Sequence, residues 1–192
     1  MKKTLAILLA IITTCLPVNA SILDDITNDL NSEPPNEKII TIGNVVFVLP
    51  LSWDTLIDDT IDEITDCMFD NDGCYIDLLY TGSSKEHPYE DFVFKSMYDS
   101  DVERLKESKE GKFVIKETSK DIDVLEWPGF VYCLVYQEDD SINTKLTTIF
   151  LTGDGLMEVS YNSDDETTPF LEDYSAMINN MTINGERAFP EE

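Results

Sequence analysis

Apolar residues recur along this chain in short runs that alternate with polar ones, and this pattern predicts strands. The segment 39–49 is rich in isoleucine and valine and is broken by Gly43 and Asn44, which indicates two strands joined by a tight turn. Pro50 ends the second of them, because proline has no backbone N–H to donate to a neighbouring strand. The same reasoning predicts further strands at 113–117, 123–126, 130–137, 145–151 and 156–161.

Two other segments have the spacing of three and four residues that is typical of helices. In 53–66, one helical face would hold Trp53, Leu56, Ile57, Ile61 and Ile64, and the opposite face would be acidic. A second helix is predicted from about 101 to 109, because Ser100 and Glu103 have the spacing of a capping box and Gly111 follows the helix.

The last helix is the clearest element of the sequence. Thr168 is the predicted N-cap and Pro169 the first helical residue. An apolar stripe follows, which predicts a helix packed on a sheet, and residues 182–183 are expected to form a closing strand. The stripe consists of Phe170, Leu171, Tyr174, Met177, Ile178 and Met181.

The first twenty residues have the layout of a secretory signal peptide. Lys2 and Lys3 precede an apolar run from Leu5 to Ile12, and Ala20 closes a small-residue cleavage site. The run is too short to span a bilayer. Cys15 leaves open an alternative, lipid anchoring at that cysteine, although Thr14 precedes it where glycine, alanine or serine is usual.

These features predict an exported protein, located in the periplasm or outside the cell. We expect a signal peptide at 1–20, a flexible linker at 21–38 around Pro34 and Pro35, one globular domain at 39–184 and a loose acidic tail at 185–192. After signal cleavage no membrane-spanning segment is expected.

The chain is strongly acidic, with a formal net charge of −26. Removal of the leader, which contains two lysines and no acid, would make the charge more negative still. Such a charge repels nucleic acids and anionic lipids, so a protein with a basic surface is the expected partner. It also opposes folding through self-repulsion, so salt or divalent cations are expected to stabilise the domain.

Three cysteines remain after the leader, and two of them flank a turn-rich segment. A four-residue loop from Phe69 to Asp72 would place Cys67 opposite Cys74 and allow a disulfide, whereas a two-residue turn at Asp72 and Gly73 would place Leu78 opposite Cys67. The sequence leaves both registers open. Cys133 lies in an apolar strand, where a small buried side chain is expected.

Candidate chemistry is sparse. Seven carboxylates between positions 58 and 72, with no base among them, suggest a weak calcium or other divalent-cation site, and no other cofactor is expected. The lone histidine, His87, and the thiol of Cys133 are the residues on which an enzyme would have to be built, so we expect a non-catalytic protein. The candidate cation ligands are Asp58, Asp62, Asp66, Asp70 and Asp72.

A segment near the start of the domain resembles the opening strand of PsbP-like and DcrB-like proteins. It runs Val46-Phe47-Val48-Leu49-Pro50-Leu51-Ser52-Trp53, and the chain ends, as in those proteins, with a hairpin, an acidic loop, an amphipathic helix and a final strand. The resemblance implies an α+β fold, an α/β/α sandwich with a central antiparallel sheet. It also implies a small accessory or binding domain of a bacterial envelope and carries over no functional residues. The predicted helix at 53–66 would be an insertion in that plan.

Overall fold

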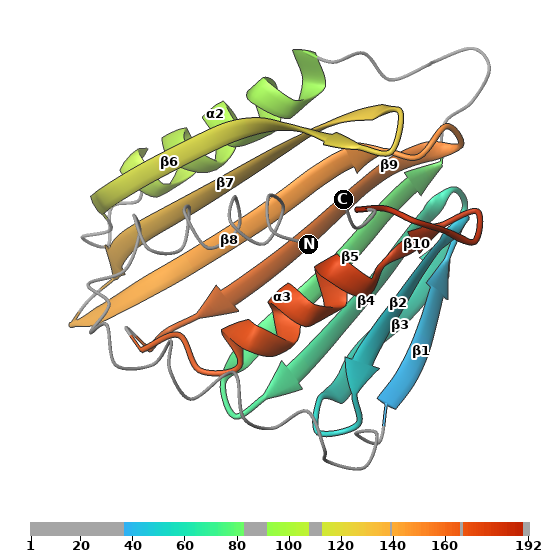
Figure 1. The fold of residues 1–192 in the computed structure, drawn as a ribbon. Helices are drawn as coiled ribbons and strands as arrows, with labels where there is room; N and C mark the ends of the chain where they lie inside the picture. The colour runs from blue at the N-terminus through green and yellow to red at the C-terminus, as the bar shows by residue number, and fades with distance from the viewer. Residues whose placement is uncertain (1–36, 83–91, 108–112, 139, 166, 190–192) are drawn as a thin grey trace.

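The computed structural model describes residues 37–82, 92–107, 113–138, 140–165 and 167–189. Seven of its strands form one antiparallel sheet in the order β3-β4-β5-β9-β8-β7-β6 (Figure 1). Consecutive strands are joined as hairpins, and β5 pairs with β9 at the centre. The strands are β3 (Asp54–Ile61), β4 (Ile64–Asn71), β5 (Cys74–Gly82), β6 (Phe113–Val124), β7 (Trp127–Glu138), β8 (Ser141–Leu151) and β9 (Gly155–Ser163).

A smaller sheet has the order β1-β2-β10-β11. Its strands are β1 (Glu37–Ile42), β2 (Val45–Pro50), β10 (Thr182–Ile183) and β11 (Glu186–Arg187). The two strands and the turn predicted for 39–49 are therefore confirmed, as is the closing strand at 182–183.

The two helices among the described residues lie on opposite faces of the seven-stranded sheet (Figure 1). Helix α2 (Phe92–Glu107) packs on β6 and β7, whereas α3 (Leu171–Asn180) and the small sheet cover the other face. The expected α+β architecture, with helices on both sides of a central antiparallel sheet, is confirmed. The small sheet is an addition to the predicted plan.

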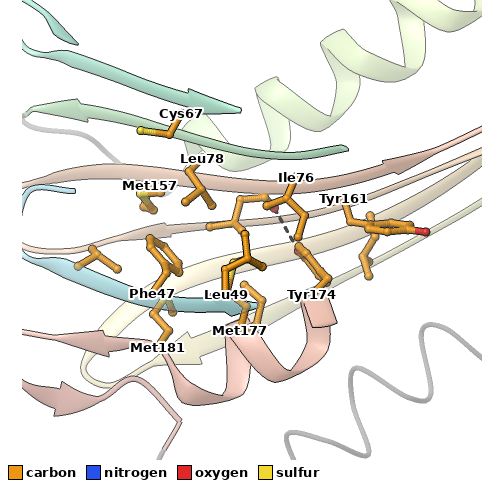
Figure 2. Packing of buried hydrophobic residues seen from close by; sticks show 14 of the residues in the cluster. Phe47, Leu49, Cys67, Ile76, Leu78, Met157, Tyr161, Tyr174, Met177 and Met181 are labelled. Carbon is orange, nitrogen blue, oxygen red and sulfur yellow. Dashed lines mark hydrogen bonds between the residues drawn. The ribbon is translucent and has the colours of Figure 1, made fainter. Parts of the chain in front are cut away.

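The main core lies between α3, the small sheet and the large sheet (Figure 2). Tyr174 of α3 is fully buried, and its hydroxyl donates to the carbonyl of Val159 at 3.1 Å and lies 3.1 Å from the hydroxyl of Thr148. Burial of a tyrosine requires a partner for its hydroxyl, and two strands provide it here. The prediction that the apolar stripe of the last helix packs on a sheet is confirmed, with Tyr174, Met177, Ile178 and Met181 all buried.

The helix predicted at 53–66 is wrong, because this segment forms β3 and the beginning of β4. Its apolar residues do not gather on one buried face: Trp53 is buried before the strand begins, whereas Ile57, Ile61 and Ile64 are exposed. The segment is rich in isoleucine and threonine, which favour strands, and Asp62 adopts a positive φ of 56° in the connecting turn.

The two predicted helix starts also need correction. Helix α2 begins at Phe92, so Ser100 lies inside it instead of capping it; an apolar face of Phe94, Val102 and Leu105 extends the helix toward its N-terminus. Helix α3 begins at Leu171 after Phe170, which has a φ of 61°, and neither Thr168 nor any other side chain caps it.

Residues just outside the predicted domain boundaries belong to the fold. The last two residues of the predicted linker, Glu37 and Lys38, are already in β1. The tail predicted to be loose from 185 forms β11, and the N–H of Ala188, which is buried, donates to Met181 at 2.9 Å. The signal peptide, Cys15, residues 21–36 and the end of the tail from 190 lie outside the described residues.

The β4–β5 hairpin has the two-residue turn at Asp72 and Gly73, both with positive φ. Cys67 therefore lies opposite Leu78, and Cys74 lies opposite Asn71. Four residues of extended strand separate positions 67 and 71, about 13 Å, which is beyond the reach of a disulfide. In this structure Cys67 and Cys74 do not form a disulfide and are buried free thiols.

Candidate functional site

The sheet face that carries α2 is the part of the molecule where polar side chains gather. On β5, Ile76 and Leu78 are buried toward α3, so Asp77 between them lies on the α2 side. The register then places Asp77 beside Ser160, and Ser160 beside Thr147. This face therefore has a polar row across its middle, whereas the opposite face is mainly apolar.

Helix α2 covers one half of this face. Phe94, Val102 and Leu105 of α2 pack on Tyr132 and Leu134 of β7, within a second apolar cluster that also includes Ile149 and Leu156. Tyr98 adds an edge contact with Tyr132, with ring centroids 5.3 Å apart. The half of the face over β6 and β7 is therefore closed.

Asp101 of α2 joins the helix to the sheet through a buried charged cluster. Its carboxylate accepts a hydrogen bond of 2.6 Å from the hydroxyl of Tyr132 and one of 2.5 Å from the ammonium of Lys145. Burial alone would raise the pKa of Asp101, but the charge of Lys145 and these hydrogen bonds outweigh it and hold the pKa below its ordinary value. Burial, followed by the charge of Asp101, raises the pKa of Tyr132, so its hydroxyl stays a donor.

A second carboxylate borders this cluster on β9. Glu158 lies 3.9 Å from the ammonium of Lys145 and accepts a hydrogen bond of 3.3 Å from Ser160. Burial raises the pKa of Glu158, and the nearby charge of Lys145 opposes the shift. Lys145 thus lies between two carboxylates, and Arg104, 3.0 Å from Asp101, adds a second, exposed cation to the cluster.

Asp77 is the carboxylate whose negative charge is least well stabilised by its surroundings. Oδ2 accepts a hydrogen bond of 3.0 Å from the amide of Asn162, whereas the buried Oδ1 has no hydrogen-bond partner among the described residues. Burial, and then the charge of Asp66, raises the pKa of Asp77 to about 6. Asp77 therefore lies at the border between the buried cluster and solvent.

Beyond Asp77 the face opens to solvent. We call this region the open face; within the described residues it is not covered by either helix, and its side chains are exposed or half-buried. The cross-strand register assigns its residues to the same side of the sheet. They are Ile57, Asp59, Ile61, Ile64, Asp66, Met68, Tyr75, Asp77 and Leu79.

Charge is distributed unevenly between the two ends of the sheet. Every charged residue from Asp54 to Gly82, the whole of β3, β4 and β5, is an acid. Bases are found at the other end, on α2, β6 and β8: Lys95, Arg104, Lys106, Lys116, Lys120 and Lys145. The nearby base of β1, Lys38, lies over the ring of Phe69 on the α3 side. The open face therefore combines a negative field with exposed apolar side chains.

The structure does not bring the five predicted cation ligands together. Asp58 points to the α3 side, where Cys67 contacts it, whereas Asp66 lies on the open face. Asp62 and Asp72 lie in turns at opposite ends of β4. Within the part of the chain that the structure describes, no group of three or more acidic, cysteine or histidine side chains is close enough to hold a metal ion.

The residues proposed for an enzyme do not assemble into a site among the described residues. His87 lies outside them. Cys133 is buried on the α3 side of β7, as expected of a small apolar side chain. Burial and the neighbouring Asp58 raise the pKa of the Cys67 thiol to about 11, which opposes formation of a nucleophilic thiolate.

Five residues of this face were not predicted from the sequence: Asp77, Asp101, Tyr132, Lys145 and Glu158. A signal was present for two of them. Lys145 is the only base between Lys120 and Arg187, and it stands in an apolar strand. Asp77 interrupts the most apolar stretch of β5. The association of the five residues could not be read from the sequence, because it depends on how five elements, β5, α2, β7, β8 and β9, pack together.

Comparison with known proteins connects this architecture with solved structures alone. No family model matches the chain, and no curated protein matches it. The cyanobacterial PsbP protein CyanoP from Synechocystis sp. PCC 6803 aligns with a TM-score of 0.53 and 9% identity, over 83% of this chain and 99% of its own.

Two further solved structures align at lower scores. PA94 from Pseudomonas aeruginosa, a protein of unknown function, has a TM-score of 0.41 and 10% identity over 81% of this chain and 99% of its own. LpqN from Mycobacterium tuberculosis, involved in cell envelope biogenesis, has a TM-score of 0.44 and 13% identity over 86% and 98%. The likeness to CyanoP confirms the expected resemblance at the level of the fold: this chain has a PsbP-like α+β fold.

Proposed function

We propose that this protein is an exported, non-catalytic binding domain whose open face binds a partner protein with a basic surface, in the bacterial envelope or outside the cell. The observation that carries the proposal is the separation of charge across the sheet: β3, β4 and β5 contain acids and no base, and their α2-side face is open. Complementary charge steers such a partner to this face and fixes its orientation.

The apolar side chains of the open face provide the contacts through which a partner steered by charge would bind. Ile57, Ile61, Ile64 and Tyr75 are all exposed, and they stand among the acids on adjacent strands. Interfaces bind through apolar contacts at the centre, whereas charged rims contribute mainly to the association rate and to specificity. A mixed acidic and apolar face therefore suits a protein partner better than a small ion.

Export is supported by the leader-like start of the sequence and is compatible with the fold. The solved structures that align include LpqN, described as involved in envelope biogenesis, and a PsbP protein. Among the described residues no helix is long and apolar enough to cross a membrane. N-terminal sequencing of protein recovered from the medium or periplasm would test the leader: a chain beginning at Ser21 is expected, and recovery from the cytosol with Met1 retained would contradict export.

Binding is tested with a charge variant of the open face and a matched control. The variant D59N/D66N/D77N removes three carboxylates from the open face. The control D121N/D123N/D140N removes three from β6 and the β7–β8 connection, at the other end of the large sheet. Each protein is immobilised and exposed to envelope extract at low salt. Wild type and the control are expected to retain the same envelope protein, and the open-face variant is expected not to retain it. Equal retention by all three proteins, or retention by none, would contradict the proposal.

A further inference from the structure

Strand β3 forms one end of the large sheet, and its backbone is available for pairing. Within the described residues it pairs with β4 alone, and all eight of its residues are exposed. Edge strands of natural proteins are usually protected by lysine, proline or a covering element, because an open edge can pair with another chain. β3 contains neither lysine nor proline; its protection is a bulge at Leu56 and three aspartates, which repel an acidic strand but attract a basic one.

The register shows which backbone groups of β3 face outward. Ile61 and Ile64 flank a two-residue turn and form its hydrogen-bonded pair, so the pairs alternate from there along the strand. Asp58 and Thr60 then point their N–H and C=O groups away from β4. The N–H of Thr60 donates to the carboxylate of Asp59 at 2.8 Å, as expected of a group without a strand partner. Asp58 and the carbonyl of Thr60 remain available at the edge.

The side chains of β3 select what can pair there. A second copy of this chain would bring Asp58 and Asp59 against the same acids, and like charges directly opposite one another destabilise strand pairs. An extended segment with lysine or arginine at alternate positions can place these side chains on the open face, where their charges oppose Asp59. Their apolar stems then lie beside Ile57 and Ile61, which are exposed on the same face; Ile61 is 65% exposed.

We propose that β3 is a docking edge to which an extended basic segment of a partner protein adds as a further strand. This inference rests on the proposed function and makes it more specific: backbone pairing at β3 supplies affinity, and the acids and isoleucines of the open face supply specificity. The bulge of β3 at Leu56 interrupts the regular register, so the docking edge extends from Ile57 to Ile61.

The test compares two labelled peptides of equal charge by fluorescence anisotropy at low salt. One, of about nine residues, alternates lysine with valine; the other alternates lysine with proline, which lacks the N–H that strand pairing requires. We expect the valine peptide to bind wild type at least tenfold more tightly. Equal affinities would overturn docking at β3 but leave binding of basic partners intact. Binding of neither peptide would count against both proposals.

Two variants locate the binding edge without changing charge. T60P places a proline ring at an outward position of β3, and S119P does the same on β6, the opposite edge of the sheet. T60P is expected to reduce the affinity for the valine peptide to that for the proline peptide, and S119P is expected to leave it unchanged. The reverse pattern, or no effect of T60P, would overturn the inference.

Amide hydrogen exchange gives a readout on wild type that does not depend on either variant folding. The valine peptide at saturation is expected to slow exchange of the Asp58 amide at least tenfold, because that N–H acquires a strand partner. Unchanged exchange at Asp58 in the presence of bound peptide would also overturn the inference.

Discussion

Asp59 and Asp66 occupy directly opposite positions of the β3–β4 hairpin, so two carboxylates face each other on the open face. Asp54 and Asp70 are also directly opposite one another near the other end of the hairpin, where Lys38 of β1 lies close to Asp54. Like charges at such positions destabilise a strand pair, and no base of β3, β4 or β5 offsets them. The molecule therefore carries a local cost in stability where the proposed partner would bring compensating charge.

Neutralising one carboxylate of this pair should stabilise the protein. We expect D59N to raise the free energy of unfolding by about 0.5 kcal/mol at low salt, because it removes the repulsion across the hairpin. In about 1 M sodium chloride the gain should disappear, since the Debye length falls to roughly 3 Å. Urea denaturation measures both values. D121N is the control, because Asp121 lies opposite Phe130; an equal gain from that substitution would refute the assignment.

Calcium and sodium should stabilise the protein alike when ionic strength is matched. The acids from Asp58 to Asp72 are spread over two strands and two turns, so screening, not coordination, is the expected effect. Thermal melts in calcium chloride and sodium chloride would measure this. A rise in the melting temperature specific to calcium would instead support the cation-site hypothesis.

Asp77 should make stability fall as the pH rises from about 4 to about 6. Its pKa is about 6 in the folded protein, above the ordinary value of 3.8, so the folded state retains a proton that the unfolded state has lost in this interval. The contribution of Asp77 to the free energy of unfolding is thus fully present below about pH 4 and is lost above about pH 6. D77N cannot titrate, and we expect its stability relative to wild type to increase by about 1–2 kcal/mol from pH 4 to pH 7, after allowance for solvent screening.

Chemical denaturation of both proteins at four pH values would measure this difference. Asp101 acts in the opposite direction, because its folded pKa lies below the ordinary value, but it is common to both proteins and cancels in the comparison. A difference between wild type and D77N that stays constant with pH would show that Asp77 titrates normally.

Removing Lys145 alone should lower the free energy of unfolding more than removing the charges of both Lys145 and Asp101. K145M leaves Asp101 and Glu158 without their buried cation, and we expect a loss of about 3 kcal/mol. In K145M/D101N the carboxylate at 101 is also neutralised, so part of the loss should be recovered. A double-mutant cycle by urea denaturation measures the coupling. Additive effects of K145M and D101N would mean that the two side chains contribute independently.

Gly155 should tolerate no side chain. An added Cβ would lie 2.5 Å from the carbonyl oxygen of Thr81 and 2.7 Å from the ring of Tyr80, so G155A is expected to cost about 3 kcal/mol by overpacking. G185A is the control: Gly185 has a φ of 83° and open space around it, so only the backbone conformation opposes a side chain, at about 1 kcal/mol. Equal losses would show that backbone conformation alone explains both.

Local patterns predicted well the elements that are stabilised by near neighbours in sequence. The turn at Gly43, the two strands it joins and the apolar stripe ending at Met181 are all present. The turn at Asp72 and Gly73 is one of the two alternatives that the sequence left open. The helix predicted for 53–66 was wrong, because the apolar residues of this segment have helical spacing but do not form a buried helical face. Strand β3 lies at the open edge of the sheet with all its residues exposed, so it lacks the alternation of apolar and polar residues that usually indicates a strand.

The candidate face was beyond the reach of local patterns for a different reason. The acids of β3 to β5 were evident as a run, but their place on one sheet face depends on the register of hairpins and on where α2 packs. Likewise the contact of Asp101 with Lys145 joins residues 44 positions apart. Such relationships are tertiary, and a single sequence does not contain them in readable form.

The most direct test of the account is to map where a basic ligand contacts the folded protein. Isotope-labelled protein would be titrated with the lysine–valine peptide at low salt while amide chemical shifts are recorded. The account predicts saturable shifts concentrated in β3, β4 and β5, around Ile57, Asp66 and Asp77, and little change on β6 or α2. Shifts spread evenly over all acidic surfaces, or concentrated on the α2 end, would contradict it.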